Sequence, residues 1–277
     1  MENKFTLVRN IYRINNDASS VTVIGCEENF TGIATIPNSV QFNGKTYKVT
    51  KIDNRAFAGC TGMTKAIIGN SVEMIGESAF EDCSGLTSIV VASENTKYDS
   101  RNNCNAIIET ATDTLIAGCK NTIIPDTVTE IGHRAFDGCC GLTSVIIPNS
   151  VTEINNLAFN GCRGLTSIVV ESGNLKYDSR NNCNAIIETA TNTLIVGCKT
   201  TVIPESVTEI HDFAFNGCRD LTSVEIPDSV SKIGGWAFNG CRDLTSVEIP
   251  DSVEWIGPCA FSGTPWERNR RKEPTKK

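Results

Sequence analysis

The stretch AFNGCRDLTSVEIPDSV occupies residues 214–230 and recurs letter for letter at residues 237–253. Its opening pair, Ala-Phe, returns along the chain with phenylalanine at positions 57, 80, 136, 159, 215, 238 and 261. Successive phenylalanines are 23 or 56 residues apart, and each 56-residue step contains an additional unit of 33 residues. Fixed periods of this size predict a solenoid, a stack of similar rungs, rather than a closed globule.

The short, 23-residue rung predicts its own local structure. Val224 and Ile226 lie two residues apart, so residues 221–226 are expected to form a short strand with both side chains facing inward. Pro227 ends this strand because it lacks an N–H group. The rest of the rung spaces its apolar residues by three and four, which favours a short helical or irregular turn with its apolar side inward, at Val230, Ile233, Ala237 and Phe238.

A single rung has about seven apolar side chains and no second layer to cover them. Neighbouring rungs must supply that cover, so we expect about nine stacked rungs sharing one parallel sheet roughly 40 Å long. The middle residue of each strand then points outward. These residues form the outward column: Thr35, Ile67, Val90, Ile123, Ile146, Val169, Val202, Glu225 and Glu248.

The two long, 33-residue rungs share the sequence KYDSRNNCNAIIETAT at residues 97–112 and 176–191. We expect a hairpin here, with Ile107 opposite Ile116 and Ile108 opposite Leu115. Such a hairpin would also bring cysteines face to face, in the pairs Cys104–Cys119 and Cys183–Cys198. The sequence leaves two alternatives equally open for each pair: a disulfide, or two neighbouring free thiols.

Six other cysteines occupy one position per rung, next to the phenylalanine: Cys60, Cys83, Cys139, Cys162, Cys218 and Cys241. Stacked residues have parallel Cβ vectors, a poor geometry for a disulfide, so we expect these six to be buried free thiols. No zinc site is predicted, because the sequence has no C-x-x-C motif.

The sequence predicts no catalytic residues, no cofactor and no metal site. Any histidine-dependent site must use His133 or His211, which do not share an aligned rung position and are expected to be polar turn residues. Neither a glycine-rich phosphate loop nor a paired-acid motif is present. A cysteine nucleophile in a long rung is the remaining enzymatic alternative.

The pattern C-x-x-L-x-x-[IV]-x-[IV]-P-x-x-V-x-x-I-x-x-x-A-F-x-x-C runs in full from Cys139 and from Cys218, and its first part, as far as Val170, runs from Cys162. It resembles the BspA-like (Treponema-type) leucine-rich repeats of bacterial surface proteins. The resemblance covers about residues 30–264 and includes the long rung, a variant found in that family. It implies a leucine-rich-repeat solenoid of the α/β or mainly β class. For several family members it also implies surface exposure and adhesion to host or partner proteins.

The ends of the chain depart from the repeat. Residues 1–29 are expected to form an N-terminal cap, in which IYRI and SSVTVIG flank NNDA as in a hairpin. Residues 30–264 are expected to form the solenoid. Thr264 stands where a cysteine would recur, which predicts that Pro265 and Trp266 close the last rung. The basic tail, residues 265–277, is expected to be disordered.

Charge and hydropathy narrow the classes of partner that this chain can be expected to bind. The net charge of −7 argues against binding to nucleic acid or to anionic lipid. No apolar segment is long enough to cross a membrane, and the first residues carry no recognisable export signal. We expect a cell-surface or secreted protein whose leader has been removed, with a cytoplasmic protein as the alternative.

The outward column is the candidate binding surface, because its residues are apolar from Ile67 to Val202 and acidic at Glu225 and Glu248. Solvent-facing strand positions are usually polar, so an apolar column indicates a contact surface or reflects β-propensity alone. We favour a non-enzymatic protein-binding or adhesion module. Its ligand would be a host or cell-surface protein, an extended peptide or a second copy of the chain. The alternatives are a structural spacer for another domain and a self-associating surface protein.

Overall fold

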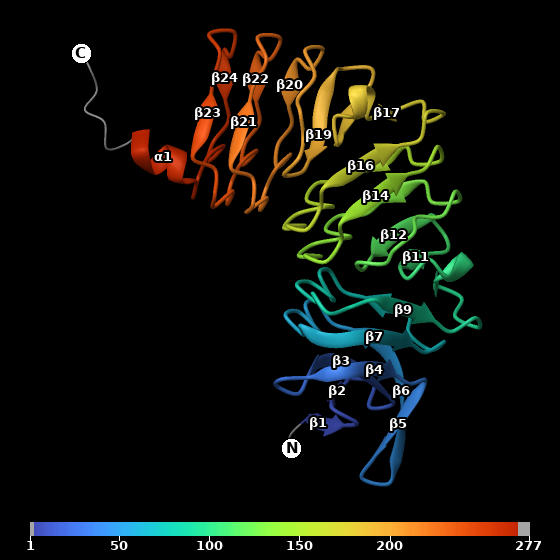
Figure 1. The fold of residues 1–277 in the computed structure, drawn as a ribbon. Coiled ribbons are helices and arrows are strands. Elements are labelled where there is room, and N and C mark those ends of the chain that lie inside the picture. Colours follow the sequence, from blue (N-terminus) through green and yellow to red (C-terminus); the bar gives the residue numbers. More distant parts are fainter. Residues whose placement is uncertain (1–2, 271–277) are drawn as a thin grey trace. The chain divides into compact units, whose positions relative to one another are not determined.

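The computed structural model describes residues 3–270 (Figure 1). The chain divides into two compact units. Unit 1 holds the residues up to Gly141 together with Glu153–Ala158. Unit 2 holds Leu142–Thr152 and the residues from Phe159 onward. Each unit is a mainly β stack of rungs, built from short strands and the turns between them.

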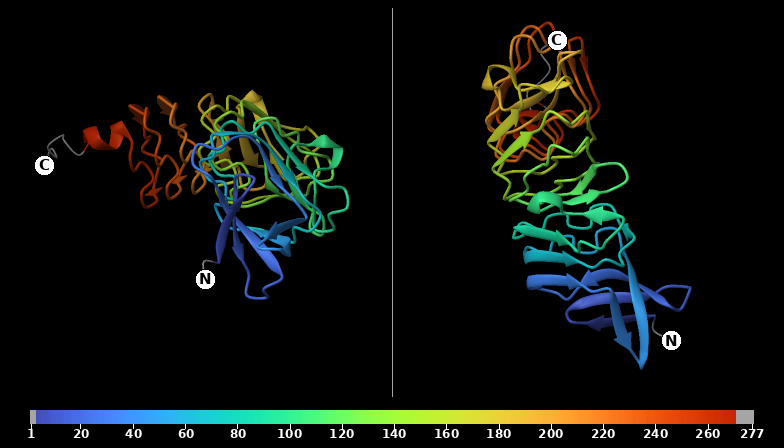
Figure 2. Two further views of the ribbon diagram at one scale, coloured as in Figure 1. Left: turned by 90° about the horizontal axis from the view of Figure 1, so that it is seen from below. Right: turned by 90° about the vertical axis from the view of Figure 1, so that its right-hand side faces the viewer.

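A mostly antiparallel sheet at the N-terminal end of unit 1 adjoins the first rung (blue in Figure 2). Its strands lie in the order β1-β2-β3-β6-β5, with β8 also beside β6. They are β1 (Lys4–Leu7), β2 (Asn10–Ile14), β3 (Ser20–Cys26), β5 (Ser39–Phe42), β6 (Lys45–Ile52) and β8 (Met74–Ile75). The antiparallel pairing of β2 with β3 confirms the predicted hairpin. The parallel pairing of β3 with β6 connects this hairpin to the stack.

The predicted rung strands form in both units as in-register parallel neighbours. In unit 1 they are β4 (Thr31–Ile36), β7 (Gly62–Ile68) and β9 (Ser88–Val91). In unit 2 they are the pairs β14 (Ser144–Ile147) with β16 (Ser167–Val170), and β21 (Ser223–Glu225) with β23 (Ser246–Glu248).

The expectation of one continuous parallel sheet is wrong, because no strand forms at Ile123 or Val202. The Ile123 N–H donates to the Cys104 carbonyl (3.0 Å), and the Val202 N–H donates to the Cys183 carbonyl (3.1 Å). These acceptors lie in the long-rung sequence itself. The long rungs therefore interrupt the row of rung strands.

Two further sheets run along the opposite part of the rungs and were not expected from the sequence. In unit 1 the order is β10 (Tyr98–Asp99), β11 (Ile107–Glu109), β12 (Thr114–Ala117), β13 (Glu130–Ile131) and β15 (Glu153–Ile154). In unit 2 it is β17 (Tyr177–Asp178), β18 (Ala185–Glu188), β19 (Thr193–Gly197), β20 (Glu209–Ile210), β22 (Lys232–Ile233) and β24 (Trp255–Ile256). The segment after Pro227 therefore contains a two-residue strand and turns, not a helix.

The long rungs contain the predicted hairpins, in a register that changes along each hairpin. Ile108 lies opposite Leu115 as expected, but Ile107 lies opposite Ala117, not Ile116, because the register shifts between Ile107 and Ile108. The hairpin of β18 and β19 has the same shift. A 3-10 turn precedes each hairpin, η1 (Arg101–Asn103) and η2 (Arg180–Asn182).

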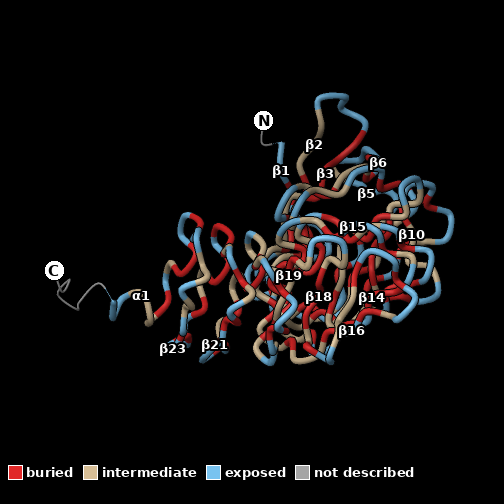
Figure 3. Tube along the Cα trace, turned by 90° about the horizontal axis from the view of Figure 1, so that it is seen from above, coloured by how far each residue is buried: buried red, intermediate tan, exposed pale blue. Residues whose placement is uncertain are grey.

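The core follows the alternation that the sequence predicts. Val224 and Ile226 are 8% and 4% exposed, which confirms that both face inward. Figure 3 shows buried and exposed segments alternating along the rungs near β21 and β23. The phenylalanine rings stack from rung to rung, with centroids 4.8 Å apart for Phe215 and Phe238 and 5.1 Å apart for Phe238 and Phe261. Each rung thus covers the apolar face of its neighbour.

The turn segments that carry Ala-Phe form a ladder of their own. The phenylalanine N–H of one rung donates to the alanine carbonyl of the next, as Phe57 does to Ala79 (2.8 Å) and Phe215 does to Ala237 (2.7 Å). The residue before each Ala-Phe has a positive φ although none of these residues is glycine: Arg55, Ser78, Arg134, Leu157, Phe213, Trp236 and Cys259. Because this conformation recurs in every such rung, it is a requirement of the turn rather than the mark of a local site.

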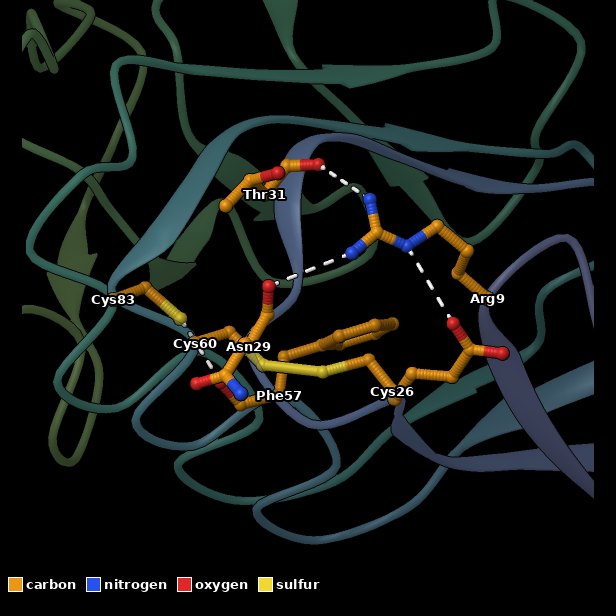
Figure 4. The surroundings of a disulfide bond; sticks show 8 residues. Arg9, Cys26, Asn29, Thr31, Phe57, Cys60 and Cys83 are labelled. Atoms are coloured by element: carbon orange, nitrogen blue, oxygen red, sulfur yellow. Dashed lines mark hydrogen bonds and ion pairs between the residues drawn. A yellow bond between two sulfur atoms is a disulfide. The ribbon is translucent and has the colours of Figure 1, made fainter.

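A disulfide joins Cys26, at the end of β3, to Cys60 in the first rung (Figure 4). The prediction that Cys60 is a free thiol is therefore wrong. In later rungs the Sγ of Cys83 donates to the Phe57 carbonyl of the preceding rung (3.0 Å), and that of Cys241 donates to the Phe215 carbonyl (3.2 Å). Cys60 has no preceding rung and meets the N-terminal hairpin instead. Cys83, Cys218 and Cys241 are buried free thiols as predicted, and Cys139 and Cys162 are buried as well.

The last rung of unit 2 ends in a short helix, α1 (Pro265–Arg270). Thr264 is fully buried, and its Oγ1 accepts a hydrogen bond from the Glu267 N–H (3.1 Å), as a helix N-cap does. The expectation that the tail is disordered from residue 265 is wrong for residues 265–270. The rest of that expectation, residues 271–277, lies outside the described residues.

Trp266 in α1 packs against the last phenylalanine of the stack. Its ring centroid lies 4.6 Å from that of Phe261, and its Nε1 donates to the Val247 carbonyl (3.1 Å). Both contacts confirm the prediction that residues 265 and 266 close the last rung.

Candidate functional site

Most side chains of the outward column face solvent. Val90 is 37% exposed and Ile123 is 73% exposed in unit 1. In unit 2, Ile146, Val169 and Val202 are 59%, 45% and 73% exposed. Large apolar side chains are usually buried, so this exposure on consecutive rungs marks the column as a candidate contact surface.

The unit 1 part of the column is formed by three adjacent strands and one turn. Thr35 of β4, Ile67 of β7 and Val90 of β9 lie side by side in register. Ile67 is half-buried, whereas Ile33 on β4 is 56% exposed and adds an apolar side chain that the sequence did not reveal. It escaped notice because it lies two residues before the middle of its strand, in the row that holds lysine and serine on the other rungs.

The unit 2 part begins with an apolar pair. Ile146 of β14 lies directly beside Val169 of β16, and the neighbouring pair in the same register is Ser144 and Ser167. Two small serines leave the apolar pair open to contact. Val202 belongs to the turn that follows the hairpin of the long rung and is anchored there by its hydrogen bond to Cys183.

The column of unit 2 ends in a pair of carboxylates. Glu225 of β21 lies directly beside Glu248 of β23, and neither makes an ion pair within the described residues. Both line a hollow of about 330 Å³ together with Glu205 and Asp228, two residues that no sequence pattern singled out. Like charges placed opposite each other on a sheet are destabilising, so a positively charged partner would relieve them.

The structure forms no disulfide in the pairs Cys104–Cys119 and Cys183–Cys198, which agrees with the second of the two alternatives that the sequence left open. The register shift is the physical reason, because it displaces the two sides of the hairpin by one residue before the cysteines are reached. Cys119 Sγ instead donates to the Asn105 carbonyl (3.2 Å), and Cys198 Sγ donates to the Asn184 carbonyl (3.4 Å).

These thiols are poor nucleophiles. Burial raises the pKa of Cys104, Cys119 and Cys183, which keeps them protonated near neutral pH. His133 accepts a hydrogen bond from Arg134 (3.3 Å), and His211 contacts the Asp212 carbonyl (3.1 Å), so neither ring is bonded to a thiol or hydroxyl. Within residues 3–270 no group of three or more His, Cys, Asp or Glu side chains could hold a metal ion.

Solved structures of several bacterial proteins are similar to this chain. The pneumococcal vaccine antigen PcpA is 16% identical, with a TM-score of 0.50 over 96% of this chain and 80% of that chain, and shares the fold. A leucine-rich cell surface protein from Faecalibacterium prausnitzii A2-165 is 25% identical, with a TM-score of 0.47 over 94% and 80% of the two chains. A leucine-rich repeat protein from Bacteroides ovatus is 23% identical, with a TM-score of 0.43 over 94% and 80%.

No curated protein matches the chain. Residues 3–270 contain no helix with the length and apolar character that crossing a membrane requires. The family model of the BspA type leucine rich repeat region matches in six copies, over residues 3–114, 116–193 and 185–269. It describes a repeat scaffold, and no enzyme family is indicated. Since the match spans nearly all of the described residues, the chain belongs to the BspA-type leucine-rich repeat family.

Proposed function

We propose that this chain is a non-enzymatic binding module of the bacterial cell surface that holds a protein ligand on the outward column. The observation that carries the proposal is the exposure of Ile146, Val169 and Val202 on consecutive rungs of unit 2. Burying apolar side chains of this kind against a partner contributes roughly 25 cal/mol per Å². Repeat proteins of this class typically act as protein-interaction modules.

The chemistry of the column defines the ligand. An apolar patch at Ile146 and Val169 is followed along unit 2 by the unpaired carboxylates of Glu225 and Glu248. A complementary ligand presents apolar side chains followed by lysine or arginine. Opposite charge at the acidic end also speeds association at low salt and suppresses acidic competitors.

The disulfide between Cys26 and Cys60 supports the proposed location. Disulfides persist in oxidising surroundings such as the cell surface and are rare in the reducing cytosol. An adhesion module that works outside the cell would gain from this covalent tie between its N-terminal hairpin and its first rung.

The test uses peptides selected from a displayed random library against the immobilised protein, with affinity measured by isothermal titration calorimetry. The column variant carries Ile146→Asp, Val169→Asp and Val202→Asp, and Leu175→Asp is the matched control because Leu175 is 94% exposed outside the column. Selected peptides should be rich in apolar and basic residues. They should bind the column variant at least about tenfold more weakly and the control equally well.

Circular dichroism and thermal unfolding should show that the column variant keeps its fold, because the three side chains face solvent. Equal affinity of the column variant and the parent protein would contradict the proposal and favour a structural spacer. Loss of a dimer in sedimentation velocity, with no selected peptide bound, would identify the column as a self-association surface.

A further inference from the structure

The long rung of unit 1 has no Ala-Phe turn segment, and its absence leaves a gap in the turn ladder. In the first rung the Phe57 N–H donates to the next rung. In the second rung the equivalent turn meets the Phe136 turn beyond the long rung, since the Asp82 N–H donates to the Asp137 carbonyl (3.4 Å). The Phe80 N–H makes no hydrogen bond within the part of the chain that the structure describes, and the Ala135 carbonyl accepts from the Gly118 N–H instead.

At this position the long rung has a glycine, Gly118, and therefore no side chain. The Gly118 N–H donates to the Ala135 carbonyl (2.8 Å), which keeps the long rung attached to the rung that follows. A Cβ at Gly118 would overlap the Phe136 ring, so the chain can pass here only without a side chain. The turns that carry Phe80 and Phe136 meet at Asp82 and Asp137, and space stays open between Phe80 and the long rung.

A cleft of about 320 Å³ lies at this place, and all of its lining residues belong to unit 1. Its apolar wall includes Phe80, Leu86, Ile116 and Ala117. The volume is at the small end of the range of about 300–1,000 Å³ that ligand pockets occupy. It suits a few residues of a peptide rather than a large ligand.

The charged side chains that line the cleft favour a positively charged ligand. Five carboxylates and one guanidinium line it: Glu77, Glu81, Glu109, Glu130, Asp137 and Arg134. Arg134 pairs with Asp137 (2.7 Å), and Arg55 from outside the cleft pairs with Glu81 (2.7 Å). The three other carboxylates, those of Glu77, Glu109 and Glu130, have no cationic partner within the described residues. An anionic ligand would be repelled, and a guanidinium or ammonium group would be attracted.

We propose that this cleft binds an extended peptide segment with a basic side chain. A peptide carbonyl accepts the hydrogen bond that the Phe80 N–H cannot give within unit 1, as in strand addition to a free edge. The stem of the arginine or lysine packs against Leu86 and Ile116, and its charged end faces Glu77 and Glu109. The peptide thereby lies between Phe80 and the long rung.

The probe is N-acetyl-L-arginine N-methylamide, followed by amide chemical shifts in a nuclear magnetic resonance titration of the full chain. We expect saturable shifts centred on the Phe80 amide, whose proton moves downfield as it gains a hydrogen bond. The corresponding glutamate derivative should not bind. The alanine derivative should bind about tenfold more weakly, because it keeps the carbonyl and lacks the cation.

Two variants separate charge from shape. Glu77→Gln with Glu109→Gln should weaken the arginine probe about tenfold and leave the alanine probe unchanged. The matched control, Glu94→Gln with Asp126→Asn, removes two exposed carboxylates outside the cleft and should change neither. Ile116→Trp should fill the cleft and block both probes.

Three results would overturn the proposal: no saturable shift, shifts centred away from Phe80, or equal weakening by the cleft variant and its control. The column variant of unit 2 should bind the arginine probe normally. The proposal for the cleft is therefore tested independently of the proposal for the outward column.

Discussion

Replacing Asn174 by alanine should destabilise the protein strongly, because this one side chain holds the long rung of unit 2 in place. Asn174 is buried in that rung. Its Nδ2 donates to the Pro148 and Val151 carbonyls (2.9 Å each), and its Oδ1 accepts from the N–H groups of Lys176 (2.9 Å) and Tyr177 (2.8 Å). One amide thus satisfies four main-chain groups and ties the long rung to the preceding short one.

The magnitude follows from these four bonds. At about 1 kcal/mol net for each hydrogen bond, Asn174→Ala loses about 4 kcal/mol. Buried groups left without a partner add to this loss, while water that reaches the partly exposed Lys176 N–H reduces it. We therefore expect the free energy of unfolding to fall by about 3–5 kcal/mol, which is large for a single substitution.

Urea unfolding followed by tryptophan fluorescence measures the loss, since Trp236, Trp255 and Trp266 all lie in unit 2. Asn156→Ala is the control, because Asn156 is exposed, and it should change stability by less than about 0.5 kcal/mol. Asn174→Asp should also destabilise, since a carboxylate keeps the two acceptor bonds but faces two carbonyls. A loss below about 1 kcal/mol for Asn174→Ala would show that the four groups find other partners and would refute this reasoning.

Three further outcomes are expected. A thiol reagent at pH 8 should modify the exposed Cys259 quickly, whereas burial raises the pKa of Cys83 to about 12, so that this thiol stays protonated and unreactive until the protein unfolds. Cys26→Ser should lower the free energy of unfolding by about 2–4 kcal/mol in denaturant titrations, because it opens a covalent loop between residues 34 positions apart; an unchanged midpoint would speak against the disulfide. Trp266→Ala should lower the midpoint of thermal unfolding, since it uncovers Phe261 at the end of the stack and removes a hydrogen bond, and Trp266→Phe should restore part of the loss.

The period and the phase of the rung strands could be predicted because one face of each strand is buried. Shifting the strand by one residue would expose Val224 and Ile226 and bury Glu225, so the sequence tolerates one phase only. The same argument placed the outward column in solvent. The N-terminal hairpin was predictable for a related reason, since two alternating segments flank a turn sequence.

The strands of the two further sheets left no such periodic pattern in the sequence. Each of its members after the hairpin is two residues long, as in Lys232–Ile233, and two residues cannot display a periodicity. Their pairing arises because stacking brings equivalent positions of neighbouring rungs into hydrogen-bond range. The register shift at Ile107 is similar, because a bulge depends on how the hairpin meets its neighbours.

The disulfide and the cleft share a cause that no single rung reveals. In both cases a residue differs from its equivalent in another rung because the neighbouring rung differs. Cys83 bonds to the Phe57 carbonyl in the turn that precedes its own. No such turn precedes that of Cys60, which pairs with Cys26 instead. The Phe57 N–H donates to the Ala79 carbonyl of the next turn, whereas the Phe80 N–H has no such acceptor within the described residues and borders a cleft.

Interactions between rungs therefore carry the functional information in this chain. Within a regular stack every main-chain donor and every apolar face is satisfied by the next copy, which leaves little with which to bind a ligand. A long rung breaks that regularity twice in unit 1, since it removes the strand at Ile123 and the turn beside Phe80. Where a rung leaves a main-chain donor or an apolar face of its neighbour uncovered, a peptide from another molecule can bind there. We accordingly expect binding to concentrate at the long rungs, and the identical short rungs at residues 214–230 and 237–253 to serve mainly as a rigid support.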